Sequence, residues 1–137
     1  QSIRLVYVSR LDQDKYARML LRSTFCLAPV GDRGTPGARL FEAIGAGCVP
    51  LIVGLSDDAE LPLAKQIAYS RFAGFLSRSA FAKDPVYALS ALVHRLTPRL
   101  PAMRQALADA RHRLAHGEQG GVTTLMIRAV AAAAPAG

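Results

Sequence analysis

A glycine-rich stretch at residues 31–38 (GDRGTPGA) carries residue types that suit an anionic ligand. It contains three glycines, an arginine and a threonine: Gly31, Gly34, Gly37, Arg33 and Thr35. Glycine lets the backbone approach a ligand closely. The guanidinium, the hydroxyl and the backbone N–H groups of the loop can donate hydrogen bonds to phosphate oxygens. We therefore expect this stretch to bind phosphate groups.

Arg39 and Glu42 follow the glycine-rich stretch and are three residues apart. On a helix, this spacing puts both side chains on one face near the N-terminal end. The guanidinium can then meet a diphosphate, while the carboxylate accepts hydrogen bonds from two ribose hydroxyls. The same spacing fits an ordinary ion pair on a solvated face, worth roughly 0.3 kcal/mol. Spacing alone does not decide between the two interpretations.

The pattern of apolar residues predicts the elements that position these side chains. Strands are predicted at residues 3–9, 25–30, 48–54 and 72–77, and helices at 12–22, 37–46, 85–97, 101–116 and 122–134. The first five elements alternate strand and helix, which favours an α/β fold with a parallel sheet flanked by helices. The triplet at 45–47 (GAG) ends the helix predicted at 37–46, so we expect a helix cap there rather than a phosphate loop.

Composition and charge narrow the classes of partner. The 137 residues are predicted to form a single domain, and they hold 17 Lys and Arg against 10 Asp and Glu, a formal net charge of +7. This charge favours anionic partners. The arginines are scattered rather than interleaved with aromatic residues, so we expect no nucleic-acid partner. No segment resembles a membrane span or a signal peptide. We expect the chain to be a piece of a longer protein, with any membrane anchor outside it.

Two cysteines lie near the starts of predicted neighbouring strands. If those strands are parallel neighbours, Cys26 and Cys48 can approach each other. Their settings are apolar, however, and cysteines in such settings are more often buried small hydrophobes than disulfides. Free, buried thiols are therefore the favoured expectation, and a disulfide is the alternative left open.

Four blocks of the sequence together resemble the exostosin-like glycosyltransferases. The blocks are residues 22–32 (RSTFCLAPVGD), 39–44 (RLFEAI), 47–53 (GCVPLIV) and 60–62 (ELP). They occur in the order of that family and at nearly its spacing, within a region from about Tyr16 to Phe75. The loop from Gly31 to Arg39 looks one residue longer than the common pattern, Gly37 stands where the family often has serine, and Leu63 where it often has phenylalanine.

The resemblance implies both a fold and an activity. Family members are Golgi type II membrane proteins with two Rossmann-like halves, in the GT-B arrangement, and include animal heparan sulfate polymerases and plant enzymes that build xylan, xyloglucan and pectin. The chain resembles the C-terminal, nucleotide-sugar-binding half. By this resemblance Arg39 would contact the diphosphate, Glu42 would hold the ribose, and residues 31–37 would close over the phosphates. The implied location is the lumenal side of the Golgi membrane.

The reaction implied is an inverting displacement in which an acceptor hydroxyl of a glycan attacks the anomeric carbon of a UDP-sugar. Arg39 and the helix N-terminus can stabilise the leaving diphosphate, so we expect neither a metal nor another cofactor. His112 and His116 fit a solvated basic helix better than a metal site. We expect the catalytic base in the other half of the enzyme.

An acidic cluster at Asp57, Asp58 and Glu60 follows the strand predicted at 48–54. Ligands gather at the carboxyl ends of parallel strands, so these acids can contact the donor sugar or assist the acceptor. The favoured alternative is a helix N-terminus that attracts acids through its dipole. Hydrolysis by paired carboxylates is less favoured, because the acids are too close in sequence to flank a sugar.

Two alternatives to a donor-binding domain remain open from the sequence. In one, the same fold is a noncatalytic module that binds an anionic glycan or a partner protein through its basic surface. In the other, the chain is a degenerate copy without activity. Binding that responds to salt but ignores Glu42 would favour the noncatalytic module.

Overall fold

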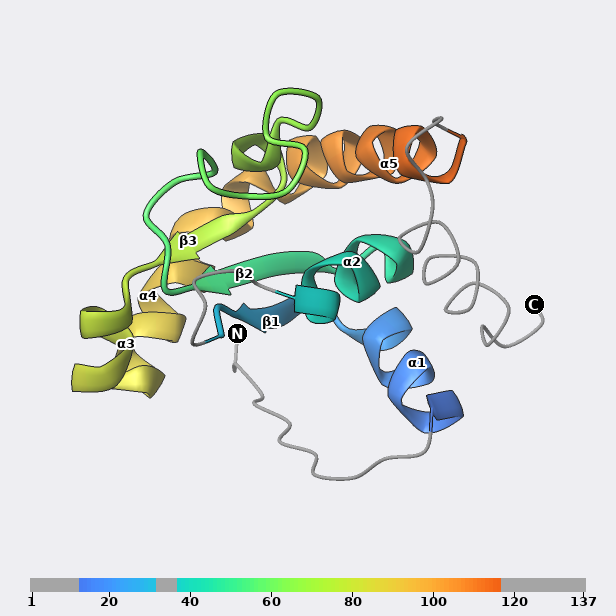
Figure 1. Ribbon diagram of the computed structural model, residues 1–137. Helices are drawn as coiled ribbons and strands as arrows, with labels where there is room; N and C mark the ends of the chain where they lie inside the picture. The colour runs from blue at the N-terminus through green and yellow to red at the C-terminus, as the bar shows by residue number, and fades with distance from the viewer. Residues whose placement is uncertain (1–12, 32–36, 117–137) are drawn as a thin grey trace.

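The computed structural model describes residues 13–31 and 37–116, which form an α/β structure (Figure 1). The elements are α1 (Gln13–Arg22), β1 (Phe25–Pro29), α2 (Gly37–Ala46), β2 (Val49–Val53), η1 (Tyr69–Arg71), β3 (Gly74–Leu76), α3 (Arg78–Lys83), α4 (Pro85–Leu96), η2 (Thr97–Arg99) and α5 (Leu100–His116). The predicted α/β class is confirmed. The strand predicted at 3–9 and the helix predicted at 122–134 lie outside the described residues.

The described strands form one parallel sheet in the order β1-β2-β3. Cys26 pairs in register with Pro50, and Leu51 pairs with Gly74. Backbone hydrogen bonds continue the pairing past the strand ends, because the Val30 N–H donates to the Val53 carbonyl at 2.9 Å. The carboxyl ends of all three strands therefore lie along one edge of the sheet.

Helices cover both faces of the sheet. On one face, Cys26 of β1 packs with Ala43 of α2. On the other face, a side chain added at Gly74 would point at Leu96 and Leu92 of α4. Because successive strand residues alternate between faces, α2 and α4 lie on opposite sides of the sheet. This two-sided cover agrees with a Rossmann-like fold and explains why every residue of β2 is buried.

Helix α5 turns an apolar face to the core. Met103, Leu107 and Leu114 are all buried in the main core. The helix packs against α2, β2 and η1. The long last helix of the described residues therefore closes the core beside the sheet (Figure 1).

Capping residues set the end of α2 and the starts of α3 and α4. Gly47 ends α2 with a φ of +72°, which confirms the predicted cap. Helix α3 was not predicted, because its six residues are too few to show a clear apolar period. It begins where the Ser77 hydroxyl accepts from the Ala80 N–H at 3.2 Å. Asp84 then caps α4 by accepting from the Tyr87 N–H at 3.1 Å.

The two cysteines form a disulfide, so the favoured expectation of free thiols is wrong and the alternative holds. The Cα atoms of Cys26 and Cys48 are 5.8 Å apart. Cys26 lies in β1 opposite Pro50, and Cys48 lies two residues before Pro50 at the entry to β2. The parallel register therefore brings the two residues within disulfide range. The predicted burial of both cysteines is confirmed.

Candidate functional site

The candidate site lies where the loop after β1 leads into α2. Gly31, after the end of β1, is exposed, and Gly37 begins α2. Gly37 has a φ of +53°, a left-handed conformation that glycine adopts easily and serine does not. Arg33, Gly34 and Thr35 lie outside the described residues.

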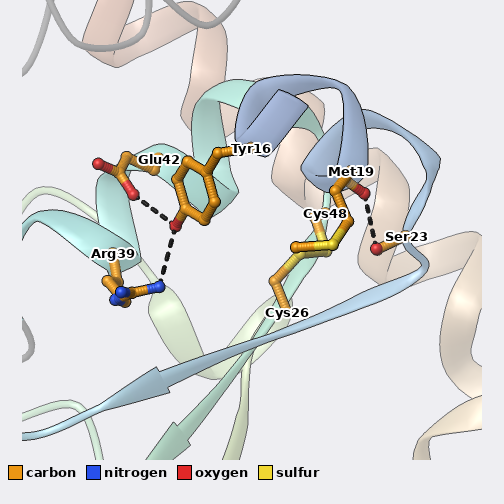
Figure 2. Close-up of a disulfide and its surroundings, with 7 residues drawn as sticks. All are labelled: Tyr16, Met19, Ser23, Cys26, Arg39, Glu42 and Cys48. Atoms are coloured by element: carbon orange, nitrogen blue, oxygen red, sulfur yellow. Dashed lines mark hydrogen bonds between the residues drawn. A yellow bond between two sulfur atoms is a disulfide. The ribbon is translucent and has the colours of Figure 1, made fainter. Parts of the chain in front are cut away.

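Arg39 and Glu42 lie on the same side of α2 and meet through a third residue, Tyr16 of α1 (Figure 2). The Tyr16 hydroxyl donates to Glu42 Oε2 at 2.7 Å. The same hydroxyl accepts from an Arg39 Nη1–H group at 3.4 Å. The Arg39 guanidinium carbon also lies 5.5 Å from the centre of the Tyr16 ring, within the range of a cation–π contact. The ordinary ion pair considered from the spacing is thus replaced by a bridge through a tyrosine.

The electrostatics of the bridge keep Tyr16 protonated. Burial raises the pKa of the Tyr16 hydroxyl to about 12, and the hydrogen bond and negative charge of Glu42 act in the same direction, while Arg39 opposes them. A neutral hydroxyl can donate and accept at the same time. Tyr16 therefore serves Glu42 as a donor and Arg39 as an acceptor at neutral pH.

Packing of α1 on α2 fixes the position of Tyr16. Leu20 of α1 is buried in a small cluster with Ala43, Ala46 and the two cysteines, and Tyr16 packs against its edge. The end of α1 is held by Ser23, whose hydroxyl donates to the Met19 carbonyl at 2.7 Å (Figure 2). The disulfide and the apolar side of α1 thus support the ring that contacts Arg39 and Glu42.

The acidic cluster lies in the loop between β2 and η1. The segment from 55 to 68 forms turns, so the favoured prediction of a helix N-terminus is wrong. Asp57 Oδ1 accepts from the Ala59 N–H at 3.0 Å, and Asp58 Oδ2 accepts from the Ser70 N–H at 3.4 Å. Glu60 is exposed. Short Asp side chains favour such turns, which place the cluster after β2 without a helix dipole.

One further arginine at the sheet edge was missed from the sequence. Arg78, the first residue of α3, donates through Nη2 to the carbonyl of Val30 at 3.5 Å. Its guanidinium reaches across the Gly54 backbone, where φ is +114°. No sequence signal marks this contact, because it joins residues 48 positions apart. Tyr16 was also missed, because its polar contacts arise only when α1 packs on α2.

The part of the chain that the structure describes contains neither a metal-ligand cluster nor a membrane-spanning helix. Within residues 13–31 and 37–116, no three His, Cys, Asp or Glu side chains gather in a way that would hold a metal ion. No helix in that part of the chain combines the length and the apolar character needed to cross a membrane.

Comparison with known proteins identifies the family. The family model described as the Exostosin GT47 domain matches residues 4–92, which is more than half of the 137 residues and includes all three strands of the sheet. No curated protein matches the chain. The matched region contains Tyr16, Arg39, Glu42 and the disulfide. The resemblance seen in the sequence is confirmed: the chain belongs to the exostosin GT47 family and is a glycosyltransferase domain.

Proposed function

We propose that this domain binds the UDP part of a UDP-sugar on the N-terminal half of α2, as the donor half of a two-domain enzyme of the GT-B type. The sugar is then transferred, with inversion, to a glycan or polysaccharide acceptor. The observation that carries the proposal is the convergence of Arg39 and Glu42 on one side of α2, close to the carboxyl edge of the sheet. Ligands of open α/β folds bind at this edge.

The proposed contacts use the free capacity of both side chains. A carboxylate has about four acceptor positions. Tyr16 occupies one of them on Glu42, so the carboxylate can still accept from two ribose hydroxyls. Arg39 is exposed and donates one hydrogen bond to Tyr16, while a guanidinium has about five N–H donors in all. The remaining donors suit the diphosphate, together with the free N–H groups at the start of α2.

The reaction requires the diphosphate to leave as an anion. In the proposed displacement, the acceptor oxygen forms a bond to the anomeric carbon as the bond from that carbon to the β-phosphate oxygen breaks. The acceptor proton passes to a general base, which we expect in the other half of the enzyme. The positive charge of Arg39 and the dipole of α2 stabilise the negative charge that develops on UDP. On this basis we expect UDP to bind without a divalent metal.

The acidic loop is the proposed contact for the sugar. Asp57, Asp58 and Glu60 follow β2, the strand next to β1. They therefore lie beyond the same edge of the sheet as the start of α2.

We propose the lumenal side of the Golgi membrane as the location. The Cys26–Cys48 disulfide supports this location, because disulfides persist in the oxidising secretory compartments.

A titration with UDP tests the proposal directly. We expect wild type to bind UDP saturably in the presence of EDTA, and Arg39→Ala and Glu42→Gln each to weaken binding about tenfold or more, because each removes a charge-assisted hydrogen bond. Two matched variants control for charge: Arg95→Ala on α4 and Asp109→Asn on α5, both at exposed positions outside the proposed site. They should bind like wild type.

Three outcomes would oppose the proposal. Folded wild type that does not bind UDP would reject it for this chain. Equal losses in all four variants would point to nonspecific attraction. Binding to a sulfated glycan that weakens with salt and ignores Glu42→Gln would favour the noncatalytic module.

A further inference from the structure

Tyr16 contacts both proposed UDP-binding residues. It comes from α1, 26 residues before Glu42, and reaches both side chains with a single hydroxyl (Figure 2). The contact with Glu42 is the shorter, at 2.7 Å, and the contact with Arg39 is reinforced by the ring, 5.5 Å from the guanidinium carbon. The three groups therefore form a connected unit.

We propose that Tyr16 is a positioning residue that holds Arg39 and Glu42 apart and oriented, so that both are available to a nucleoside diphosphate. This inference rests on the proposed function of α2. Arg39 and Glu42 are spaced so that they can also pair directly with each other. A two-pronged pair between guanidinium and carboxylate would use both carboxylate oxygens and two N–H donors. The Tyr16 hydroxyl between them uses one lone pair of Glu42 and one N–H of Arg39.

The support beneath Tyr16 makes it suitable for this role. Tyr16 is half buried, and it packs beside a cluster formed by Leu20, Ala43, Ala46 and the disulfide. A ring fixed by packing keeps its hydroxyl in one place, which lowers the entropy lost when a ligand binds. Tyr16 thus gives Arg39 a hydrogen-bond partner that packing holds in place on a different helix. Arg39 itself is exposed, so this contact is what orients its side chain.

The hydroxyl and the ring have separable effects. Tyr16→Phe keeps the ring beside Arg39 and removes only the hydroxyl. Without it, Arg39 and Glu42 can turn toward each other, and UDP must then break a direct ion pair. We expect UDP affinity to fall about fivefold in Tyr16→Phe, with no change in net charge.

A double-mutant cycle separates positioning from other roles. The variants are Tyr16→Phe, Glu42→Gln and the combination, each titrated with UDP under conditions where unfolding curves show a folded domain. Because Tyr16 acts through Glu42, its loss should cost little once Glu42 is replaced, so the combined effect should be much smaller than the product of the single effects. The matched control is Tyr69→Phe, which removes another hydroxyl, one that donates to the Pro62 carbonyl at 2.6 Å in the loop after β2. It should leave UDP affinity unchanged.

A second measurement needs no variant at Tyr16. In NMR spectra of wild type with labelled tyrosine rings, saturating UDP should shift the resonances of Tyr16 and leave those of Tyr69 in place. This measurement holds even if Tyr16→Phe does not fold.

The outcomes distinguish the positioning role from the function on which it rests. If Glu42→Gln weakens UDP binding and Tyr16→Phe does not, the site stands and the positioning role is rejected. If the effects of the two substitutions simply multiply, Tyr16 acts independently of Glu42 and the role is also rejected. If UDP shifts neither tyrosine and does not bind wild type, both proposals fail together.

Discussion

At the scale of single residues, the site depends on one hydroxyl that the sequence did not single out. Arg39 and Glu42 could be chosen from their spacing after a glycine-rich stretch, because helix geometry alone puts them on one face. Tyr16 could not be chosen in the same way. Its partners lie on another helix, and only the packing of α1 on α2 brings them within hydrogen-bond distance.

The pKa of Tyr16 responds to both of its neighbours, in opposite directions. Glu42→Gln removes a negative charge and should lower the Tyr16 pKa from about 12, whereas Arg39→Ala removes a positive charge and should raise it further. Alkaline titration followed by tyrosinate absorbance measures the shift, with Tyr16→Phe identifying the signal. Shifts of the same sign in the two variants, or none, would show that Tyr16 does not lie between them.

The same pKa predicts how stability changes in alkali. An unfolded tyrosine titrates near pH 10, and folded Tyr16 holds its proton up to about pH 12. The folded state therefore binds more protons in this window, so the contribution of Tyr16 to stability is complete below about pH 10 and is lost as pH rises toward about 12. Denaturation curves should show a smaller alkaline loss for Tyr16→Phe than for wild type.

At the scale of elements, local sequence patterns predicted most of the helices and strands. The features that they did not predict depend on tertiary packing and strand register. The helices at α1, α2, α4 and α5 and the three strands lie within about two residues of their predicted bounds, because each has a clear apolar period or a strong end signal. Helix α3 was too short to show a period. The loop after β2 was misjudged, since acids that suit a helix N-terminus also suit the turns that it forms.

The disulfide shows why register matters. Apolar surroundings correctly indicated that both cysteines are buried, but whether they pair depends on how β1 aligns with β2, which no local pattern specifies. The link closes a loop with a sequence separation of 22 residues. It also joins the start of β2 to β1 beneath α1 and α2, the two helices that form the site.

Removal of the disulfide should destabilise the domain. We expect Cys26→Ala combined with Cys48→Ala to lower the free energy of unfolding by about 3 kcal/mol, mainly because the unfolded chain gains freedom. Chemical denaturation measures the loss, and wild type treated with a reductant should show a similar loss. Two thiols that react in denatured, unreduced wild type would contradict the pairing.

At the scale of the whole molecule, a parallel sheet covered on both faces places the start of α2 and the acidic loop at one edge. The sequence predicted this arrangement because alternating strands and helices leave few topologies. It also carried the family resemblance that the Exostosin GT47 match over residues 4–92 confirms. The contacts of Arg33, Gly34 and Thr35 lie outside the described residues and stay predictions.

The central claim is that UDP binds on α2 at the carboxyl edge of the sheet. The most direct measurement is an amide NMR titration of the wild-type chain with UDP. We expect saturable shifts concentrated at Gly31, at the first two turns of α2 and at Tyr16, with α5 unchanged. Shifts concentrated on α5, or none in a folded protein, would contradict it.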